Sequence, residues 1–283
     1  METLPLLASL FLAVPSCLGE TFFWHSPSPT PAEAAALLRA VCPGAVQPGG
    51  TAPDSLAGCK PCPKYTSVGT LEPRRAMGFL FELHTVIYGS FTRPGAREAV
   101  AGFEGCESHA TGGGGTVLLR KSHGSWAMID YQMALITSAC QTYHLKTGRD
   151  LLLCEDVDHF QGEMVQWVYL CDFSKEAQSR SETIFEVHDT RGMRSHGAIC
   201  GSIDKVLLHD LNGDGMPDVT VWFSSGRGAF PNADGPCSSD GMHASAQKHR
   251  LDFLFQPNTE SFGPAPWSES LAETYREFFR VGQ

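Results

Sequence analysis

The sequence predicts a mainly β protein of three four-stranded antiparallel blade-like units, a partial or irregular β-propeller, with a short N-terminal helix and a C-terminal helix. Three observations predict this class. Aromatic and aliphatic runs alternate with turn residues along most of the chain, Gly (29) and Pro (18) are abundant, and only 18% of the residues are charged. Such a composition is typical of many short strands joined by tight turns.

The N-terminus predicts export. Residues 4–14 form an apolar run that is too short to span a bilayer but has the length expected of a signal peptide. Small residues follow, so we expect residues 1–19 to be removed, although Met1-Glu2-Thr3 carries no Lys or Arg. A buried first strand or helix is the alternative. Val14-Pro15-Ser16-Cys17 is also compatible with a lipid anchor at Cys17. No later segment predicts a membrane span, and we expect a secreted, periplasmic or cell-surface protein.

Residues 20–66 are expected to hold a helix and a Cys-rich segment. Thr30 can cap the helix, Pro31 suits its first turn, and Glu33 can reach back to the amide of Thr30. The helix should continue to Val41 and end at Pro43. Residues 26–29 (Ser-Pro-Ser-Pro) are interpreted as a stiff linker, and residues 47–62 as a loop held by disulfides.

The chain has ten cysteines, which in an exported protein indicate disulfides. If Cys17 is removed with the signal peptide, nine remain and one thiol is left over. Proximity in the chain favours the pairs Cys42 with Cys59 or Cys62, Cys106 with Cys140, Cys154 with Cys171, and Cys200 with Cys237. A redox or zinc motif at Cys59-Lys60-Pro61-Cys62 is the alternative interpretation of that segment.

Residues 67–283 predict the β-repeat domain and its closing helix. Strand-like runs recur in three units, at about residues 78–131, 134–189 and 198–258. The first two units each show four strands, and the third shows no clear fourth strand. A period of roughly 50 to 60 residues with four strands favours propeller-like blades. Residues 268–280 then predict a helix with Leu271, Tyr275, Phe278 and Phe279 on its apolar face.

Residues 210–218 (Asp-Leu-Asn-Gly-Asp-Gly-Met-Pro-Asp) carry the clearest chemistry. Calcium takes six to eight oxygen ligands, which a tight acidic loop can supply. Asp210, Asn212 and Asp214 alternate along the loop, Met216 can offer its carbonyl, and Asp218 can close the ring. The loop lies between strands and is no EF-hand, because the twelfth position holds a valine. A plain turn built on Asn-Gly and Asp-Gly is the alternative.

This stretch resembles the calcium loop of FG-GAP or VCBS repeats, as found in integrin-α-like propellers. The resemblance implies that Asp210, Asn212, Asp214, Met216 and Asp218 are the Ca²⁺ ligands. Residues 90–98 and 148–150 align as versions of the same turn that lack most of the ligands. The resemblance therefore implies one calcium site, and a structural role for the ion.

For function, the sequence favours a binding or scaffold module for a protein or glycan ligand. A net charge of −10 without any Lys/Arg run argues against nucleic-acid binding. No convincing catalytic constellation is present, so no enzyme is expected. The alternative is a secreted glycan-active hydrolase or lyase that uses Glu155, Asp156 or Asp158, near His159, in a loop after the second strand of the second unit.

Overall fold

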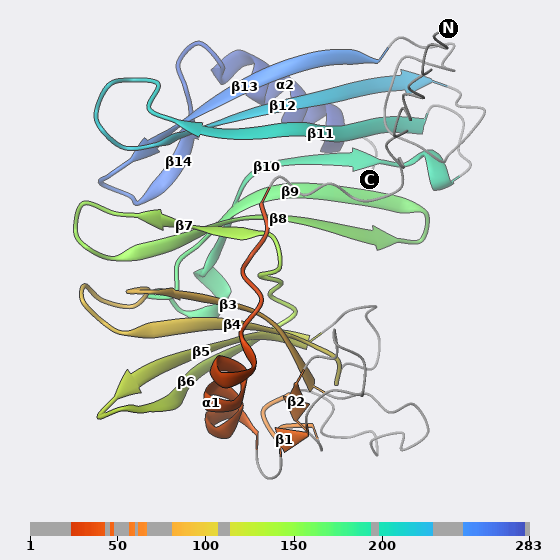
Figure 1. The fold of residues 1–283 in the computed structure, drawn as a ribbon. Coiled ribbons are helices and arrows are strands. Elements are labelled where there is room, and N and C mark those ends of the chain that lie inside the picture. Colours follow the sequence, from red (N-terminus) through yellow and green to blue (C-terminus); the bar gives the residue numbers. More distant parts are fainter. Residues whose placement is uncertain are drawn as a thin grey trace, which may run out of the picture.

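The computed structural model describes residues 24–42, 46–47, 57–59, 62–66, 81–106, 114–193, 198–228 and 246–280. The expected signal peptide and Cys17 lie outside these ranges. The predicted fold class is confirmed, because three antiparallel sheets lie one above another with few helices beside them (Figure 1). Within the described part of the chain, no helix has the length and apolar character that crossing a membrane requires.

The first sheet has six strands in sequential order. They are β1 (Val46–Gln47), β2 (Gly58–Cys59), β3 (Phe81–Gly89), β4 (Glu98–Glu104), β5 (Gly114–Ser122) and β6 (Ser125–Met133). The stretch predicted as a loop at residues 47–62 therefore contributes two short strands. Helix α1 (Pro31–Val41) packs on this sheet and begins as predicted, because Thr30 and Glu33 form a reciprocal capping box.

The second sheet contains β7 (Cys140–His144), β8 (Asp150–Phe160), β9 (Glu163–Cys171) and β10 (Ser181–Asp189). Two short 3₁₀ turns, η1 (Ala177–Ser179) and η2 (Arg191–Met193), flank β10. Strands β8 and β9 are longer than predicted. They meet in a two-residue turn in which Gln161 and Gly162 both have positive φ, the backbone that matches the twist of a hairpin.

The third sheet contains β11 (Ala198–His209), β12 (Asp218–Gly228), β13 (Gln247–Gln256) and β14 (Ser261–Pro264). The expectation that this unit lacks a fourth strand was wrong. Strand β14 pairs with β13 but spans only four residues, which is too short for a readable apolar pattern. Helix α2 (Glu269–Arg280) follows, as predicted, and its apolar side reaches the core through Ala272, Tyr275 and Phe279.

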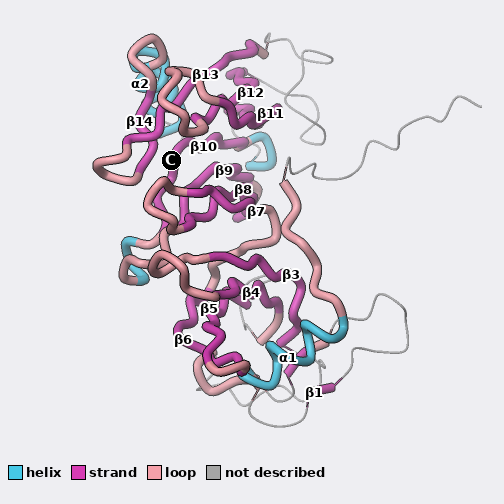
Figure 2. Tube along the Cα trace, turned by 60° about the vertical axis from the view of Figure 1, so that its left-hand side comes forward, coloured by secondary structure: helices cyan, strands magenta, loops and turns pink. Residues whose placement is uncertain are grey.

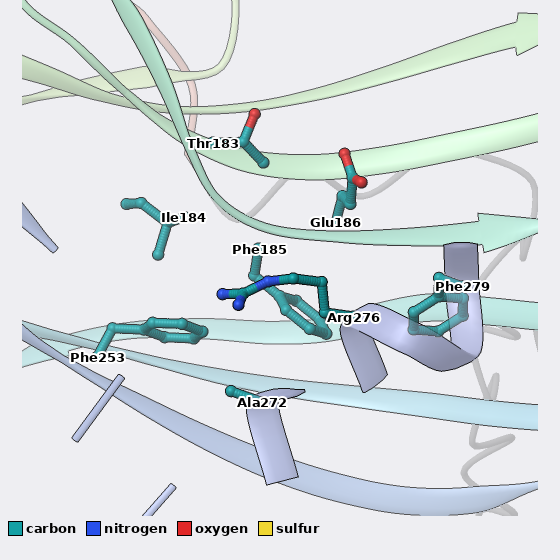
Figure 3. Close-up of a pocket in the computed structure, with 8 residues that line it drawn as sticks. All are labelled: Thr183, Ile184, Phe185, Glu186, Phe253, Ala272, Arg276 and Phe279. Atoms are coloured by element: carbon teal, nitrogen blue, oxygen red, sulfur yellow. The ribbon is translucent and has the colours of Figure 1, made fainter. Parts of the chain in front are cut away.

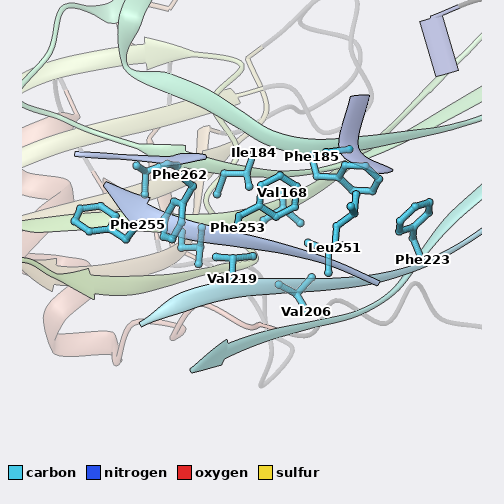
Figure 4. Close-up of a cluster of buried hydrophobic side chains, with 14 of the residues drawn as sticks. Val168, Ile184, Phe185, Val206, Val219, Phe223, Leu251, Phe253, Phe255 and Phe262 are labelled. Carbon is cyan, nitrogen blue, oxygen red and sulfur yellow. The ribbon is translucent and has the colours of Figure 1, made fainter. Parts of the chain in front are cut away.

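The apolar core is divided into three layers. The largest lies between the second and third sheets and includes Val168, Phe185, Phe223 and Phe253 (Figure 4). A second layer joins the first and second sheets, and a third lies between the first sheet and α1. Each sheet is therefore stabilised by apolar burial against a neighbouring element rather than alone.

One buried arginine joins the three units at the end where their turns lie. The guanidinium of Arg149 donates to Asp172 in the second unit at 2.5 Å, and to the carbonyl of Phe91 in the first at 3.4 Å. It also donates to Glu260 in the turn before β14. Burial opposes ionisation of Asp172, but hydrogen bonds from Arg149 and Ser174 outweigh it and lower its pKa. We call these contacts the Arg149 junction.

The N-terminal strap, residues 24–30, crosses from the upper units to α1 (Figures 1 and 2). Trp24 packs against the core between the second and third sheets. The hydroxyl of Ser26 donates to the carbonyl of Thr137 at 2.5 Å, and the amide of Val86 donates to the carbonyl of Pro27 at 2.9 Å. The segment predicted as a linker, residues 26–29, is therefore hydrogen-bonded to the first and second units.

The disulfides confirm one preferred pair and correct two. Cys42 bonds to Cys59, as expected, but the observed bonds Cys62–Cys106 and Cys140–Cys154 replace Cys106–Cys140 and Cys154–Cys171. Distance along the chain was a poor guide because strand pairing decides which cysteines face each other. Cys140 lies opposite Cys154 on β7 and β8, whereas Cys171 lies opposite Leu152.

The remaining cysteines complete this description. Cys171 is a free, buried thiol, and burial raises its pKa to about 12. Cys200 is disulfide-bonded, and its predicted partner Cys237 lies outside the described residues. The bonded pairs indicate an oxidising compartment.

We predict that Arg149→Met destabilises the protein by about 3–5 kcal/mol, because the buried carboxylate of Asp172 loses the cation that is hydrogen-bonded to it and keeps, among the described residues, only Lys175 at 3.9 Å. Urea denaturation of the oxidised protein measures the loss. Arg93→Met is the matched control, because Arg93 is exposed in the neighbouring turn and its loss should cost less than about 0.5 kcal/mol. Equal stability of the two variants would show that the Arg149 junction does not hold the units together.

Candidate functional site

The acidic loop lies where β11 turns into β12, with His209 and Asp218 as the last paired residues on either side. The equivalent strand in each unit also begins with an acid: Glu98 in β4, Asp150 in β8 and Asp218 in β12. Each of these carboxylates accepts a main-chain amide from a turn at this end of the molecule. All three units thus fix a turn through the same kind of bond, and the third unit adds further acids to it.

Hydrogen bonds to the main chain fold the loop tightly. The Asp210 carboxylate accepts the amides of Gly213 at 2.7 Å and Gly215 at 2.9 Å. Asn212 accepts the amide of Asp214 at 2.9 Å, and Asp214 accepts that of Met216 at 2.7 Å. The amide of Gly215 is the main cause that lowers the pKa of Asp210, so this carboxylate is ionised at neutral pH.

Two glycines allow this path. Gly213 and Gly215 have φ values of 78° and 80°, a left-handed backbone that side chains with a Cβ rarely adopt. Substitution of either glycine would strain the turn that brings the acidic side chains of the loop close to one another.

Asp218 anchors the loop to the third sheet. Its side chain is fully buried, and its two oxygens accept the amides of Leu211 at 2.8 Å and Phe255 at 2.9 Å. Met216 has its side chain in the core between the second and third sheets. Asp218 therefore connects the loop to the end of β13.

The second unit contacts the loop from the side. Lys146 donates to the carbonyl of Asp214 at 2.6 Å, and the Tyr143 hydroxyl donates to the carbonyl of Pro217 at 2.7 Å. Burial, and then the negative charge of Asp218, raise the pKa of Tyr143 above its ordinary range. The loop is therefore hydrogen-bonded both to β7 and to the turn between β7 and β8.

The donor set fits a calcium ion by its chemistry. Asp210, Asn212 and Asp214 bring only oxygen acceptors and one amide to the loop, which suits a hard cation. Within the described ranges, no group of three or more His, Cys, Asp or Glu side chains is arranged to hold a metal. A calcium site here would therefore depend on amide and carbonyl oxygens as well as on the carboxylates.

The residues of the two alternative sites do not converge as those hypotheses require. Cys59 and Cys62 are bonded to different partners, so they form no redox pair. Glu155, Asp156 and Asp158 lie within β8 and not in a loop, which corrects the sequence-based placement. Because β8 pairs with β9 without a bulge, Glu155 faces the opposite side of the sheet from the other two acids.

A pocket of about 390 Å³ opens between β10, β13 and α2 (Figure 3). Phe185, Phe253 and Phe279 line it, and the charged side chains of Glu186 and Arg276 complete its wall. The three phenylalanines are already buried, so little apolar surface is left for a ligand. This pocket is better described as the seam between α2 and the second sheet.

Sequence analysis missed a buried histidine next to this seam. His188 on β10 contacts Glu163 at 2.7 Å and Glu186 at 3.7 Å. The carboxylate of Glu186, as an acceptor for the imidazole, is the main cause that raises the pKa of His188; burial opposes the shift, and Glu163 supports it. Glu186 lies two residues from His188 on the same strand, whereas Glu163 is brought to the imidazole from β9 by strand pairing, so spacing along the chain did not reveal the group.

Comparisons with protein-family models, with curated proteins and with solved structures found no match to this chain.

We predict that His188 makes the stability pH-dependent. Because its pKa is raised above 6.5 in the fold, its contribution is fully present below that value and is lost as pH rises through the folded pKa. Urea denaturation from about pH 5.5 to 8.5 should show that His188→Gln costs most at the acidic end. His123→Gln, at an exposed turn, is the control. A cost that stays constant with pH would contradict the prediction.

Proposed function

We propose that this chain is an exported binding or scaffold module in which residues 210–218 hold a structural calcium ion. The observation that carries the proposal is the loop itself. It places Asp210, Asn212 and Asp214 at alternate positions of a turn that main-chain amides fold tightly. Calcium selects such clusters of oxygen donors, whereas a plain hairpin turn needs only the Asn-Gly or Asp-Gly pair.

The ligands would be the side chains of Asp210, Asn212, Asp214 and Asp218 with the carbonyl of Met216. The ion would supply positive charge to a loop that carries three carboxylates within nine residues. It would thereby stabilise the start of β12, which Asp218 already connects to the end of β13. This role requires no chemistry from the ion.

The expected affinity is low. Three carboxylates are a modest charge for a calcium site, and Lys146 brings an ammonium group to the loop. Dissociation constants on the order of 10⁻⁴ to 10⁻³ M are typical of extracellular calcium modules. A site of this affinity would bind calcium reversibly, with an occupancy set by the calcium concentration outside the cell.

Export is supported by the signal-like N-terminus and by the disulfides, which together favour an oxidising compartment outside the cytoplasm. Resemblance of the loop to FG-GAP or VCBS repeats supports a role in binding rather than catalysis. A protein or a glycan is the expected partner.

We predict that 10 mM Ca²⁺ raises the melting temperature of the oxidised protein by about 3–8 °C over chelator, and that Asp214→Ala abolishes the shift. Differential scanning calorimetry measures both. The reason is linkage, since an ion that binds only the folded loop stabilises the fold.

Asp158→Ala is the matched control, because it removes an exposed aspartate from β8 and should retain the shift. If wild type shows no shift, or if both variants lose it equally, residues 210–218 form a turn without a specific ion.

We also predict that Lys146→Met tightens calcium binding by about three- to tenfold, because it removes a positive charge from the carbonyl of Asp214. Calorimetric titration of the variant measures the affinity. Lys121→Met removes an exposed charge from the first unit and should leave the affinity unchanged. Weaker binding in Lys146→Met would mean that the lysine shapes the loop rather than competing with the ion.

A further inference from the structure

The outer face of the third sheet, which points away from the second sheet, carries an exposed row of charged and aromatic side chains. Lys205, Trp222 and Arg250 lie side by side on β11, β12 and β13. All three are exposed, and the guanidinium of Arg250 lies 5.7 Å from the centre of the Trp222 ring. Part of the corresponding side of the first sheet is covered by α1.

A buried aspartate fixes the geometry beside this row. Asp252 accepts the hydroxyl of Thr220 at 2.6 Å, the Nε of Arg250 at 3.0 Å and the indole N–H of Trp267 at 2.8 Å. Its own amide donates to Ser268 at 3.0 Å. Burial opposes ionisation of Asp252, but these side-chain bonds outweigh it and lower its pKa. Asp252 thus holds an arginine and a tryptophan in set orientations.

The groups of Arg250 and Trp267 that have no protein partner in the described part of the chain indicate the chemistry of a ligand. Arg250 donates through Nε, and no partner for its terminal nitrogens lies among the described residues. Trp267 is held by its N–H while 62% of the residue remains exposed. A flat, immobilised aromatic surface and a free guanidinium fork therefore lie together, and the fork matches a carboxylate or sulfate in a two-point contact.

A shallow pocket of about 410 Å³ joins these groups. Leu211, Arg250, Asp252, Trp267, Ser268 and Leu271 line it. Its volume falls in the range of small-ligand sites, whereas a stable protein interface needs roughly 800 Å² per partner around a continuous apolar centre. Here the charged side chains of Arg250 and Asp252 lie between the exposed rings of Trp222 and Trp267, so the residues described at this face form no continuous apolar centre. The pocket thus favours a small, partly polar ligand over a protein surface.

We infer that this face binds an acidic saccharide, with a sugar ring on the Trp267 indole and its carboxylate or sulfate on Arg250. Lys205, on the same row, supplies a second positive charge for the neighbouring sugar. The inference deepens the proposed binding role and rests on it, but it does not depend on the calcium ion. Leu211 makes the calcium loop one wall of the pocket, so the tests are made with calcium present.

The test is a glycan array probed with the labelled, oxidised full-length protein in 10 mM Ca²⁺. Uronate-containing, sialylated and sulfated oligosaccharides should be retained, and their methyl-esterified or desulfated counterparts should not. The best oligosaccharide is then titrated by calorimetry. Trp267→Ala and Arg250→Gln should each weaken binding at least about tenfold, and 0.5 M salt should weaken it further.

Lys121→Gln is the matched control, because Lys121 forms another exposed pair with an aromatic ring, 5.5 Å from Trp126, and its loss should leave binding unchanged. Melting with calcium is measured on every variant to show that it is folded. Three results would overturn the inference: no acidic glycan retained, equal binding of the neutral counterparts, or retention of acidic peptides instead. If no glycan binds but calcium still raises the melting temperature, the saccharide inference fails and the proposed calcium site is retained.

Discussion

The Arg149 junction is the interaction on which the arrangement of the three units depends. A guanidinium can serve several acceptors at once, and this one reaches a carbonyl of the first unit and carboxylates of the second and third. Apolar layers between sheets are non-directional and would tolerate sliding. A buried ion pair is directional, because its hydrogen bonds hold only at one separation and orientation of the Arg149 and Asp172 side chains. The junction therefore fixes the register in which the sheets pack.

The acidic loop lies at the same end of the molecule as the Arg149 junction, and both contain side chains that contact a neighbouring unit. Turns of neighbouring units are bonded to one another by side chains, as when Asp150 accepts the amide of Ser90 or Lys146 donates to the carbonyl of Asp214. A cation held by residues 210–218 would have all its ligands in the third unit. The proposed calcium ion would therefore stabilise the loop that Lys146 and Tyr143 contact, rather than connect two units itself.

Much of the fold could be predicted from the sequence, because strands and caps are local. The capping box at Thr30 and Glu33 and most strands of the three units follow from residues close together in the chain, whereas the short strands β1, β2 and β14 were not predicted. The errors came from pairing across sheets. Cys140 bonds to Cys154 because β7 and β8 oppose them, and the acids of β8 are not in a loop because a Gln-Gly turn extends the hairpin.

The candidate sites divide in the same way. Residues 210–218 could be recognised because all the donors lie within nine positions. Asp252, Arg250 and Trp267 could not be recognised as a group, since Trp267 reaches β13 only after β14 has turned the chain back. His188 was missed for the same reason, because Glu163 comes from the neighbouring strand. Sites that are assembled by strand pairing leave no spacing signal.

The N-terminal strap has a consequence for how the molecule is made. Trp24 is synthesised before most of the chain, yet the core that it packs against contains residues from Tyr143 to Phe279. Contacts across such a sequence separation form slowly, because a long loop must close first. The N-terminal strap therefore cannot complete its packing until α2 has been made. A nascent chain that lacks α2 exposes an incomplete core. We expect folding to finish only after the whole chain through α2 has been synthesised, so that earlier intermediates expose apolar surface to chaperones.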